Sequence, residues 1–129
     1  MPLLLLLILI LHSFISVSCL QRLDFNLIRT FHHDAQSFTQ GIVIRNGFIY
    51  ESGGLYRRSS LQRVCASTGV VLQSTPLPPK YFAEGIALID NHIFMLTWRE
   101  KTMLIFDVDS LQLVDSRSYN TWSGEGWGL

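Results

Sequence analysis

The sequence has no excess of either charge, because its ten lysines and arginines are matched by ten aspartates and glutamates. A protein that binds nucleic acid or an acidic membrane through bulk charge carries a strong basic surplus, so we expect no nucleic-acid partner. Cysteine is also scarce, with two residues in the whole chain. Cys65 would be alone if Cys19 left with a leader, so no disulfide framework is predicted. We expect Cys65 to be a small buried core residue.

The first 19 residues contain no Lys, Arg, Asp or Glu. An unbroken apolar run over residues 3–11 is followed by small residues up to Cys19, the order of a secretory signal peptide. The basic residue that usually precedes such a run is missing, and the alternatives are an uncleaved membrane anchor or a lipoprotein leader. The run is shorter than the roughly 18 residues that span a bilayer. We therefore predict a signal peptide over residues 1–19, a secreted or secretory-lumen location, and no stable membrane association after cleavage.

Helical periodicity is missing too, since no window repeats apolar residues at the spacing of an amphipathic helix. The chain instead contains an internal repeat: residues 38–50 align without a gap with residues 82–94, at an offset of 44, and a third start lies at residues 126–129. Glycine occupies the equivalent position each time, as Gly41, Gly85 and Gly128. A period in the low forties is typical of a β-propeller blade.

Each repeat holds four short apolar or alternating segments, separated by turn signals such as Asn-Gly and Ser-Thr-Gly. The predicted strands cover residues 41–45, 48–52, 60–66 and 70–73, and then residues 85–89, 93–98, 103–108 and 112–115. The expected fold class is therefore all-β, a β-propeller of which about two and a half four-stranded blades are present. The alternatives are a generic β-meander or a helical repeat of similar period, and the missing helical periodicity disfavours the second.

The expected organisation has three parts. They are the signal peptide over residues 1–19, an N-terminal strand within residues 20–37, and a partial propeller over residues 38–129, with blades at 38–81 and 82–125 and the start of a third at 126–129. The alternating segment at residues 23–31 is expected to be a strand that completes the outer edge of a final blade. A ring needs at least four blades, so we expect a fragment, a truncated isoform, or one partner of an assembly that supplies the rest.

The first strand of a propeller blade lines the central channel, and the repeat places Gln40, Glu84 and Trp127 at the same position of that strand. Phe38 and Phe82 precede the first two at equivalent positions. These side chains are therefore expected to surround one mouth of the channel.

A carboxyl group among aromatic side chains should resist ionisation, because desolvation disfavours its charged form. Trp98 stands in the second repeat where the first has Gly54, and adds to these aromatic surroundings. Such a carboxyl can shuttle protons near neutral pH. The alternative is that Glu84 only binds backbone amides at the channel rim.

Several segments, in matching order and with closely matching spacings, resemble the plant- and bacterial-type glutaminyl cyclases. They are Phe38-Thr39-Gln40-Gly41, Glu51-Ser52-Gly53-Gly54-Leu55-Tyr56, Ser59-Ser60, Phe82-Ala83-Glu84-Gly85, Leu96-Thr97-Trp98 and Glu125-Gly126-Trp127-Gly128-Leu129. The resemblance covers residues 24–129, under half of that family's length. It implies a five-bladed propeller and an aminoacyltransferase that converts the N-terminal glutaminyl residue of a peptide to pyroglutamate, releasing ammonia.

The resemblance also implies roles for individual residues. Glu84 would be the catalytic acid/base, taking a proton from the attacking α-amine and giving it to the departing amide nitrogen. Gln40 would bind the substrate by hydrogen bonds, and four residues would form the apolar walls: Phe38, Phe82, Trp98 and Trp127. The implied partner is a peptide or protein with an N-terminal Gln, and the reaction requires no cofactor. The run His32-His33-Asp34 looks like metal ligands, but adjacent strand residues point to opposite faces, so no metal site is expected.

Two departures from the family pattern matter. Ala83 stands where the family usually has glycine, and the family's Asn and Lys, which stabilise charge on the substrate's amide oxygen, lie in later blades. Loss of such a stabiliser costs about a hundredfold to a thousandfold in rate, so we expect the 129-residue chain alone to be poorly folded and nearly inactive. The competing functions are a non-catalytic secreted peptide-binding propeller module, or a vestigial product without function.

Overall fold

The computed structural model describes residues 22–129, which divide into a short unit up to Thr30 and a compact unit from Phe31 to Leu129. The expected signal peptide lies outside the described residues and stays a prediction. Strands are the regular elements of the described part, which includes no helix and hence none able to cross a membrane.

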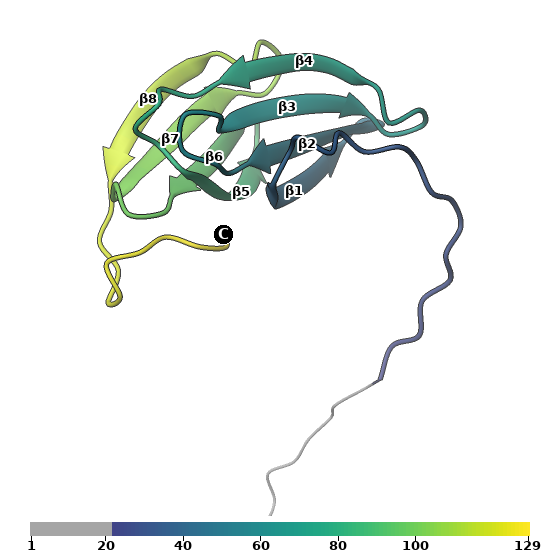
Figure 1. Cartoon of the computed structure of the whole chain (residues 1–129), viewed down its shortest axis with the longest axis horizontal. Coiled ribbons are helices and arrows are strands. Elements are labelled where there is room, and N and C mark those ends of the chain that lie inside the picture. Colours follow the sequence, from purple (N-terminus) through teal and green to yellow (C-terminus); the bar gives the residue numbers. More distant parts are fainter. Residues whose placement is uncertain (1–21) are drawn as a thin grey trace, which may run out of the picture. The chain divides into compact units, whose positions relative to one another are not determined.

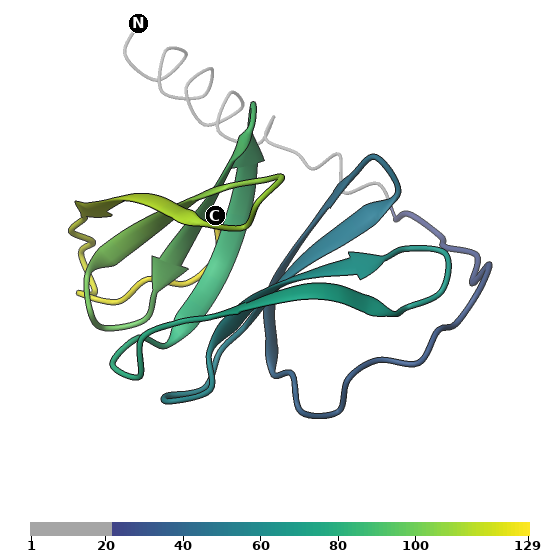
Figure 2. The same cartoon turned by 90° about the horizontal axis from the view of Figure 1, so that it is seen from above.

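Eight strands form two antiparallel four-stranded sheets, each in sequential order (Figure 1). The first sheet, blade 1, consists of β1 (Thr39–Arg45), β2 (Phe48–Gly53), β3 (Ser60–Cys65) and β4 (Val71–Pro76). The second, blade 2, consists of β5 (Ala83–Ile89), β6 (His92–Thr97), β7 (Thr102–Asp107) and β8 (Leu113–Ser118). Figure 2 shows them from above as two separate sheets. The eight predicted strands are confirmed, and the fold is an all-β partial propeller.

The two blades differ in the length of one loop. Corresponding strands are offset by 44 residues for the first two strands and by 42 for the last two, because the β2–β3 loop at residues 54–59 is two residues longer than the β6–β7 loop at residues 98–101.

The β1–β2 turn has the backbone conformation that its Asn-Gly sequence favours. Asn46 and Gly47 have φ values of 50° and 78°, as a two-residue hairpin turn of type I′ requires.

The expected strand at residues 23–31 is absent. Residues 22–38 contain no strand, and the side chain of Phe25 is 90% exposed. An alternating pattern becomes a strand only when a neighbour pairs with its backbone groups, and no described strand pairs with this segment. Its proposed place in a final blade stays a prediction.

The blades meet along β1 and β5, where backbone contacts backbone. A Cβ atom at Gly41 would lie 2.7 Å from the backbone nitrogen of Ile86 and 3.1 Å from the Cα of Gly85. A Cβ at Gly85 would in turn lie 2.6 Å from the Cα of Gly128. The same close approach is therefore made twice, from blade 1 to blade 2 and from blade 2 to the C-terminal segment. It explains the glycines at positions 41 and 85, whereas a Cβ at Gly128 would meet nothing within 4 Å.

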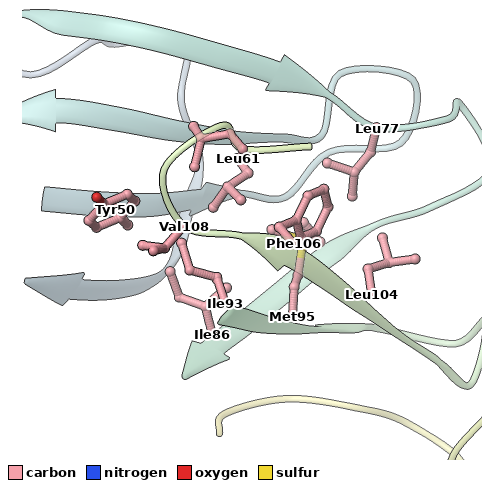
Figure 3. Close-up of a cluster of buried hydrophobic side chains, with 11 residues drawn as sticks. Tyr50, Leu61, Leu77, Ile86, Ile93, Met95, Leu104, Phe106 and Val108 are labelled. Carbon is pink, nitrogen blue, oxygen red and sulfur yellow. The ribbon is translucent and has the colours of Figure 1, made fainter. Parts of the chain in front are cut away.

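Apolar side chains fill the space between the two sheets (Figure 3). The buried cluster comprises Tyr50, Leu61, Leu77, Ala83, Ile86, Ile93, Met95, Leu104, Phe106, Val108 and Leu111. Most of these residues belong to blade 2, whereas Tyr50 and Leu61 reach in from blade 1. Outside this cluster, Arg45 at the end of β1 links blade 1 to the β5–β6 turn of blade 2. It donates hydrogen bonds to the carbonyl oxygen of Asp90 (2.8 Å) and to Oδ1 of Asn91 (2.9 Å).

The expectation that Cys65 belongs to the core is wrong. Cys65 is the last residue of β3, beside an exposed turn, so the core does not cover it and the side chain is only half-buried. Its Sγ lies 3.2 Å from Oγ of Ser67, and hydrogen bonds from Ser67 and Thr68 lower the pKa of the thiol to about 7.

Blade 1 carries a polar pair at a position where blade 2 is apolar. Glu51 and Gln62 pair across β2 and β3, and both are buried. The equivalent pair in blade 2, Met95 and Leu104, is part of the core. A buried carboxylate needs compensating partners, so Glu51 is expected to have hydrogen-bond donors nearby.

Three side chains from the start of the compact unit supply those partners. Ser37 and Thr39 donate hydrogen bonds to Oε1 of Glu51 at 2.5 and 2.7 Å, and Nε2 of His33 lies 3.0 Å from the same oxygen. Burial opposes ionisation of Glu51, but these hydrogen bonds outweigh it and lower its pKa. The network fastens residues 33–39 to β2.

We predict that Gly41→Ala destabilises the protein strongly. The new methyl group would meet the backbone of β5, which cannot move aside as a flexible side chain would. Overpacking of this kind costs about 1–3 kcal/mol, and we expect the upper end, measured by urea unfolding. Gly128→Ala is the matched control, because its Cβ would meet nothing within 4 Å. Equal losses in the two variants would contradict this account of the blade contact.

The Glu51 network predicts a pH-dependent contribution to stability. At pH 7, Glu51→Gln should lower the free energy of unfolding by about 1–3 kcal/mol, because a buried hydrogen-bonded carboxylate is lost. A carboxyl with a lowered folded pKa stabilises the protein above its unfolded pKa, and that stabilisation is lost as the pH falls through the folded value. The difference between variant and parent should therefore shrink below about pH 4.5. Asp115→Asn, at an exposed carboxylate, should change little at either pH; a gap independent of pH would count against the network.

Candidate active site

Gln40 and Glu84 lie at irregularities near the start of the innermost strands. In β1 the pairing register with β2 shifts across Gln40, which is an extra residue relative to its partner strand. In β5 the register with β6 shifts across Glu84 and Gly85, which together face Leu96. Bulges of this kind re-aim a side chain and are common beside active sites. The equivalence of Gln40 and Glu84 therefore extends to their backbone distortion.

Gly54 and Trp98 follow the second strands at equivalent positions. The backbone N–H of Gly54 donates to the carbonyl of Phe38 at 2.8 Å, and that of Trp98 donates to the carbonyl of Phe82 at 3.0 Å. A Cβ at Gly54 would lie 2.6 Å from Cε1 of Phe82 and 2.7 Å from Cγ of Gln40. The absence of a side chain at Gly54 therefore lets the side chains of Gln40 and Phe82 both pack against its backbone.

Four aromatic rings form one cluster, which includes Phe82, the residue directly before β5. The ring centroids of Phe82 and Trp98 are 5.6 Å apart, and those of Trp98 and Trp127 are 6.1 Å apart. Tyr56 joins them, 5.3 Å from Phe82 and 6.4 Å from Trp98. Three of the four predicted wall residues are thus brought together, and Tyr56 is a member that the sequence analysis did not assign. Its place inside a segment that resembles the family was the available signal.

Phe38 lies apart from this aromatic cluster. Its side chain is 56% exposed and lines a cavity of about 240 Å³, together with Leu55 and Arg58. The backbone carbonyl of Phe38 nevertheless anchors Gly54. The role of the Phe38 ring as a substrate wall stays a prediction.

Glu84 is 4% exposed. Its backbone is fixed on both sides, because its carbonyl accepts a hydrogen bond from Oγ of Ser52 at 2.7 Å and the next N–H, of Gly85, donates to Trp127 O at 2.8 Å. Burial raises the pKa of the Glu84 carboxyl above its ordinary value. Such a group exchanges its proton at a pH closer to neutral than an exposed glutamate does.

The indole nitrogen of Trp98 is buried, and no protein group within residues 22–129 accepts its hydrogen bond. Leaving a buried donor unpaired is costly, so an acceptor on a bound molecule would stabilise this site. The ring itself is held from one side, where the guanidinium of Arg99 lies 3.8 Å from its centroid and pairs with Glu125 at 3.1 Å.

Tyr119 and Glu100 were not found from the sequence. The Tyr119 hydroxyl donates to the carbonyl of Thr97, and its pKa is raised by burial and by the charges of Glu100 and Glu84. Glu100 accepts a hydrogen bond from the Tyr56 hydroxyl at 2.7 Å. The repeat offers no hint of either residue, because Glu100 lies in the loop that differs in length between the blades and Tyr119 follows that loop, outside the 44-residue alignment.

Comparison with known proteins places these features in a family context. Residues 3–129 match the family model described as glutamine cyclotransferase. The chain is 32% identical over 107 residues to a glutaminyl-peptide cyclotransferase from Arabidopsis thaliana, a match that covers 82% of this chain and 33% of the relative. The chain therefore spans about a third of that relative's length.

Two solved structures are similar to the chain. The glutaminyl cyclase of Myxococcus xanthus aligns with a TM-score of 0.68 and 27% identity, over 80% of this chain and 42% of that one. Apo AztD from Citrobacter koseri aligns with a TM-score of 0.55 and 17% identity, over 67% of this chain and 25% of that one. The second likeness concerns the fold alone.

The raised pKa of Glu84 predicts a stability cost at neutral pH. As the pH rises from about 4.5 through the folded pKa, the unfolded chain ionises more readily than the folded one, which lowers the free energy of unfolding. Glu84→Gln should therefore raise the melting temperature by a few degrees at pH 7.5 and have no such effect at pH 4. Glu125→Gln, at a less buried carboxyl paired with Arg99, should not raise it. An equal change at both pH values for Glu84→Gln would refute the assignment of burial as the cause.

Proposed function

Because this chain belongs to the glutamine cyclotransferase family, we propose that it converts the N-terminal glutaminyl residue of a peptide to pyroglutamate, with release of ammonia. The observation that carries the proposal is Glu84, a buried carboxyl of raised pKa at a bulge next to the aromatic cluster. The chain spans only about a third of the Arabidopsis relative's length. The activity in that relative's name is therefore proposed for this chain.

The proposed reaction is an intramolecular acyl transfer. The neutral α-amine of the substrate attacks the carbon of its own side-chain amide, so a nitrogen–carbon bond forms and closes a five-membered ring. The bond from that carbon to the amide nitrogen then breaks, and the nitrogen leaves as ammonia. No electrons are transferred to or from the substrate, so the chemistry requires no redox cofactor. Positioning supplies much of the acceleration of such a ring closure.

Glu84 moves the protons in this scheme. Its carboxylate takes a proton from the attacking amine, and the resulting carboxylic acid donates it to the departing amide nitrogen. The residue ends in its starting state. A pKa closer to neutral suits both halves of this transfer, because the group must accept and release a proton at the same pH.

The other site residues hold the substrate. Gln40, which like Phe82 lies against Gly54, donates hydrogen bonds to the substrate or accepts them from it. The rings of Phe82, Trp98 and Trp127 form apolar walls that keep the glutaminyl side chain folded back on its amine. The unpaired indole N–H of Trp98 supports this role, because it is a buried donor for which a substrate carbonyl is a suitable acceptor.

The proposed location is the secretory pathway or the extracellular space. The motivation is the uncharged apolar run at residues 3–11, which has the order of a signal peptide. Expression of the full chain with a C-terminal tag, followed by N-terminal sequencing of the secreted product, tests it. An uncleaved intracellular product would sink this part of the proposal.

The catalytic role of Glu84 is tested by incubating the purified chain with a peptide that begins with Gln. Loss of one ammonia is followed by mass spectrometry, which is sensitive enough for a weak activity. We expect Glu84→Gln to abolish the weak ammonia release of the chain, because a positioned acid/base contributes about 10²–10⁴-fold in rate. Asp115→Asn, at an exposed carboxylate of β8, serves as the control and should keep the parental rate. Peptide binding that is equal in parent and variant, with no ammonia released by either, would instead identify a binding module.

A further inference from the structure

Tyr56 belongs to the aromatic cluster but has no part in the mechanism above. Its ring packs against Phe82 with an interplanar angle of 70° and against Trp98 with an angle of 38°. Its side chain remains 43% exposed, whereas Phe82 and Trp98 are more deeply buried. Tyr56 therefore occupies the solvent side of the cluster.

The loop that carries Tyr56 is fixed by hydrogen bonds at both of its ends. Oγ of Ser59 accepts from the N–H of Leu55 at 3.0 Å and donates to the carbonyl of the same residue at 2.9 Å. The same Oγ also accepts from the N–H of Ala83 at 3.1 Å, which ties the loop to the start of β5. At the next position, the N–H of Arg57 donates to the carbonyl of Pro79 at 3.1 Å. The backbone of Tyr56 is thus held relative to Glu84 and its strand.

Glu100 fixes the direction of the Tyr56 side chain. Oε1 of Glu100 accepts the Tyr56 hydroxyl at 2.7 Å, and its Oε2 lies 3.4 Å from the backbone N–H of Phe82. A tyrosine phenol is protonated at neutral pH, and the hydrogen bond to Glu100 raises the pKa of Tyr56 further, so the hydroxyl acts as the donor. One carboxylate therefore connects the outer ring of the cluster to the backbone of an inner wall.

The geometry of the substrate defines what this outer ring can contact. When the glutaminyl side chain folds back on its own amine, the carbonyl of that residue still carries the rest of the peptide. The peptide must leave the cluster on its solvent side, where Tyr56 lies. Trp127 is exposed as well, but it joins the cluster through Trp98 alone, whereas Tyr56 contacts two rings and is anchored by a carboxylate.

We propose that Tyr56 contacts the residue that follows the N-terminal glutamine and favours an aromatic side chain there, and that Glu100 is a positioning residue for Tyr56. This inference rests on the proposed function, because it takes the aromatic cluster as the glutaminyl site. It concerns selectivity among peptides and leaves the proton transfers to Glu84.

The experiment compares two dipeptide amides, Gln-Phe and Gln-Gly, by tryptophan fluorescence titration. Binding is measured with the full chain carrying Glu84→Gln, so that the peptides are not consumed. With Tyr56 present, we expect Gln-Phe to bind about two- to tenfold more tightly than Gln-Gly, the range for an aromatic pair beyond simple burial. In Tyr56→Ala the two affinities should become equal.

The positioning role of Glu100 is tested by a double-mutant cycle on the same affinity ratio. Tyr56→Phe and Glu100→Ala each break the hydrogen bond, so each should lower the ratio, and the double variant should lower it no further than the larger single effect. Asp115→Ala, which removes an exposed carboxylate from β8, should leave the ratio unchanged. Independent, additive effects of Tyr56→Phe and Glu100→Ala would overturn the positioning role.

The outcomes separate this inference from the proposed function. If the affinity ratio does not change in Tyr56→Ala, while the chain with Glu84 intact releases ammonia from peptides, the inference alone is overturned. If the affinity ratio depends on Tyr56, but the chain with Glu84 intact releases no ammonia, the inference is supported and the proposed chemistry is overturned. If no peptide with an N-terminal Gln binds, both the inference and the proposed function are overturned.

Discussion

The innermost strands of the blades touch backbone to backbone, and the candidate site depends on this contact. Gly41 lies against Gly85 and Ile86, and Gly85 lies against Gly128. The residue just before each of these glycines is Gln40, Glu84 or Trp127. Bringing the glycines together therefore brings the backbones of these three residues close together, although successive ones are more than 40 residues apart in the chain. A side chain at Gly41 or Gly85 would meet the facing backbone and separate the strands that carry these residues.

Two buried glutamates illustrate how surroundings decide the properties of one chemical group. Glu51 and Glu84 are both nearly inaccessible to solvent. Hydrogen bonds from Ser37, Thr39 and His33 overcome the burial of Glu51 and lower its pKa, whereas burial raises the pKa of Glu84. The first arrangement stabilises the ionised form and holds the fold together. The second leaves a carboxyl that changes protonation state readily, which is what acid/base chemistry requires.

The site arises where the two repeats differ. The blades share strand order, turns and the glycine contact, and these shared features build the frame. Trp98 replaces Gly54, and Tyr119 occupies the place of Leu77 once the shorter loop of blade 2 is counted. The longer loop of blade 1 carries Tyr56 onto the rings of blade 2.

The amino-acid sequence alone determined the eight strands, the blade period and the equivalence of Gln40 with Glu84, because apolar alternation and turn residues are local properties that recur with the repeat. Tertiary structure decided which side chains meet. The bulges at Gln40 and Glu84, the anchoring of Tyr56 by Glu100 and the contacts of Tyr119 depend on segments far apart in the chain, which no local pattern encodes. The alternating segment at residues 23–31 has a strand-like pattern but forms no strand, because no described strand pairs with it. Periodicity specifies which face of a segment is apolar, but only a packed neighbour turns that face into structure or into a site.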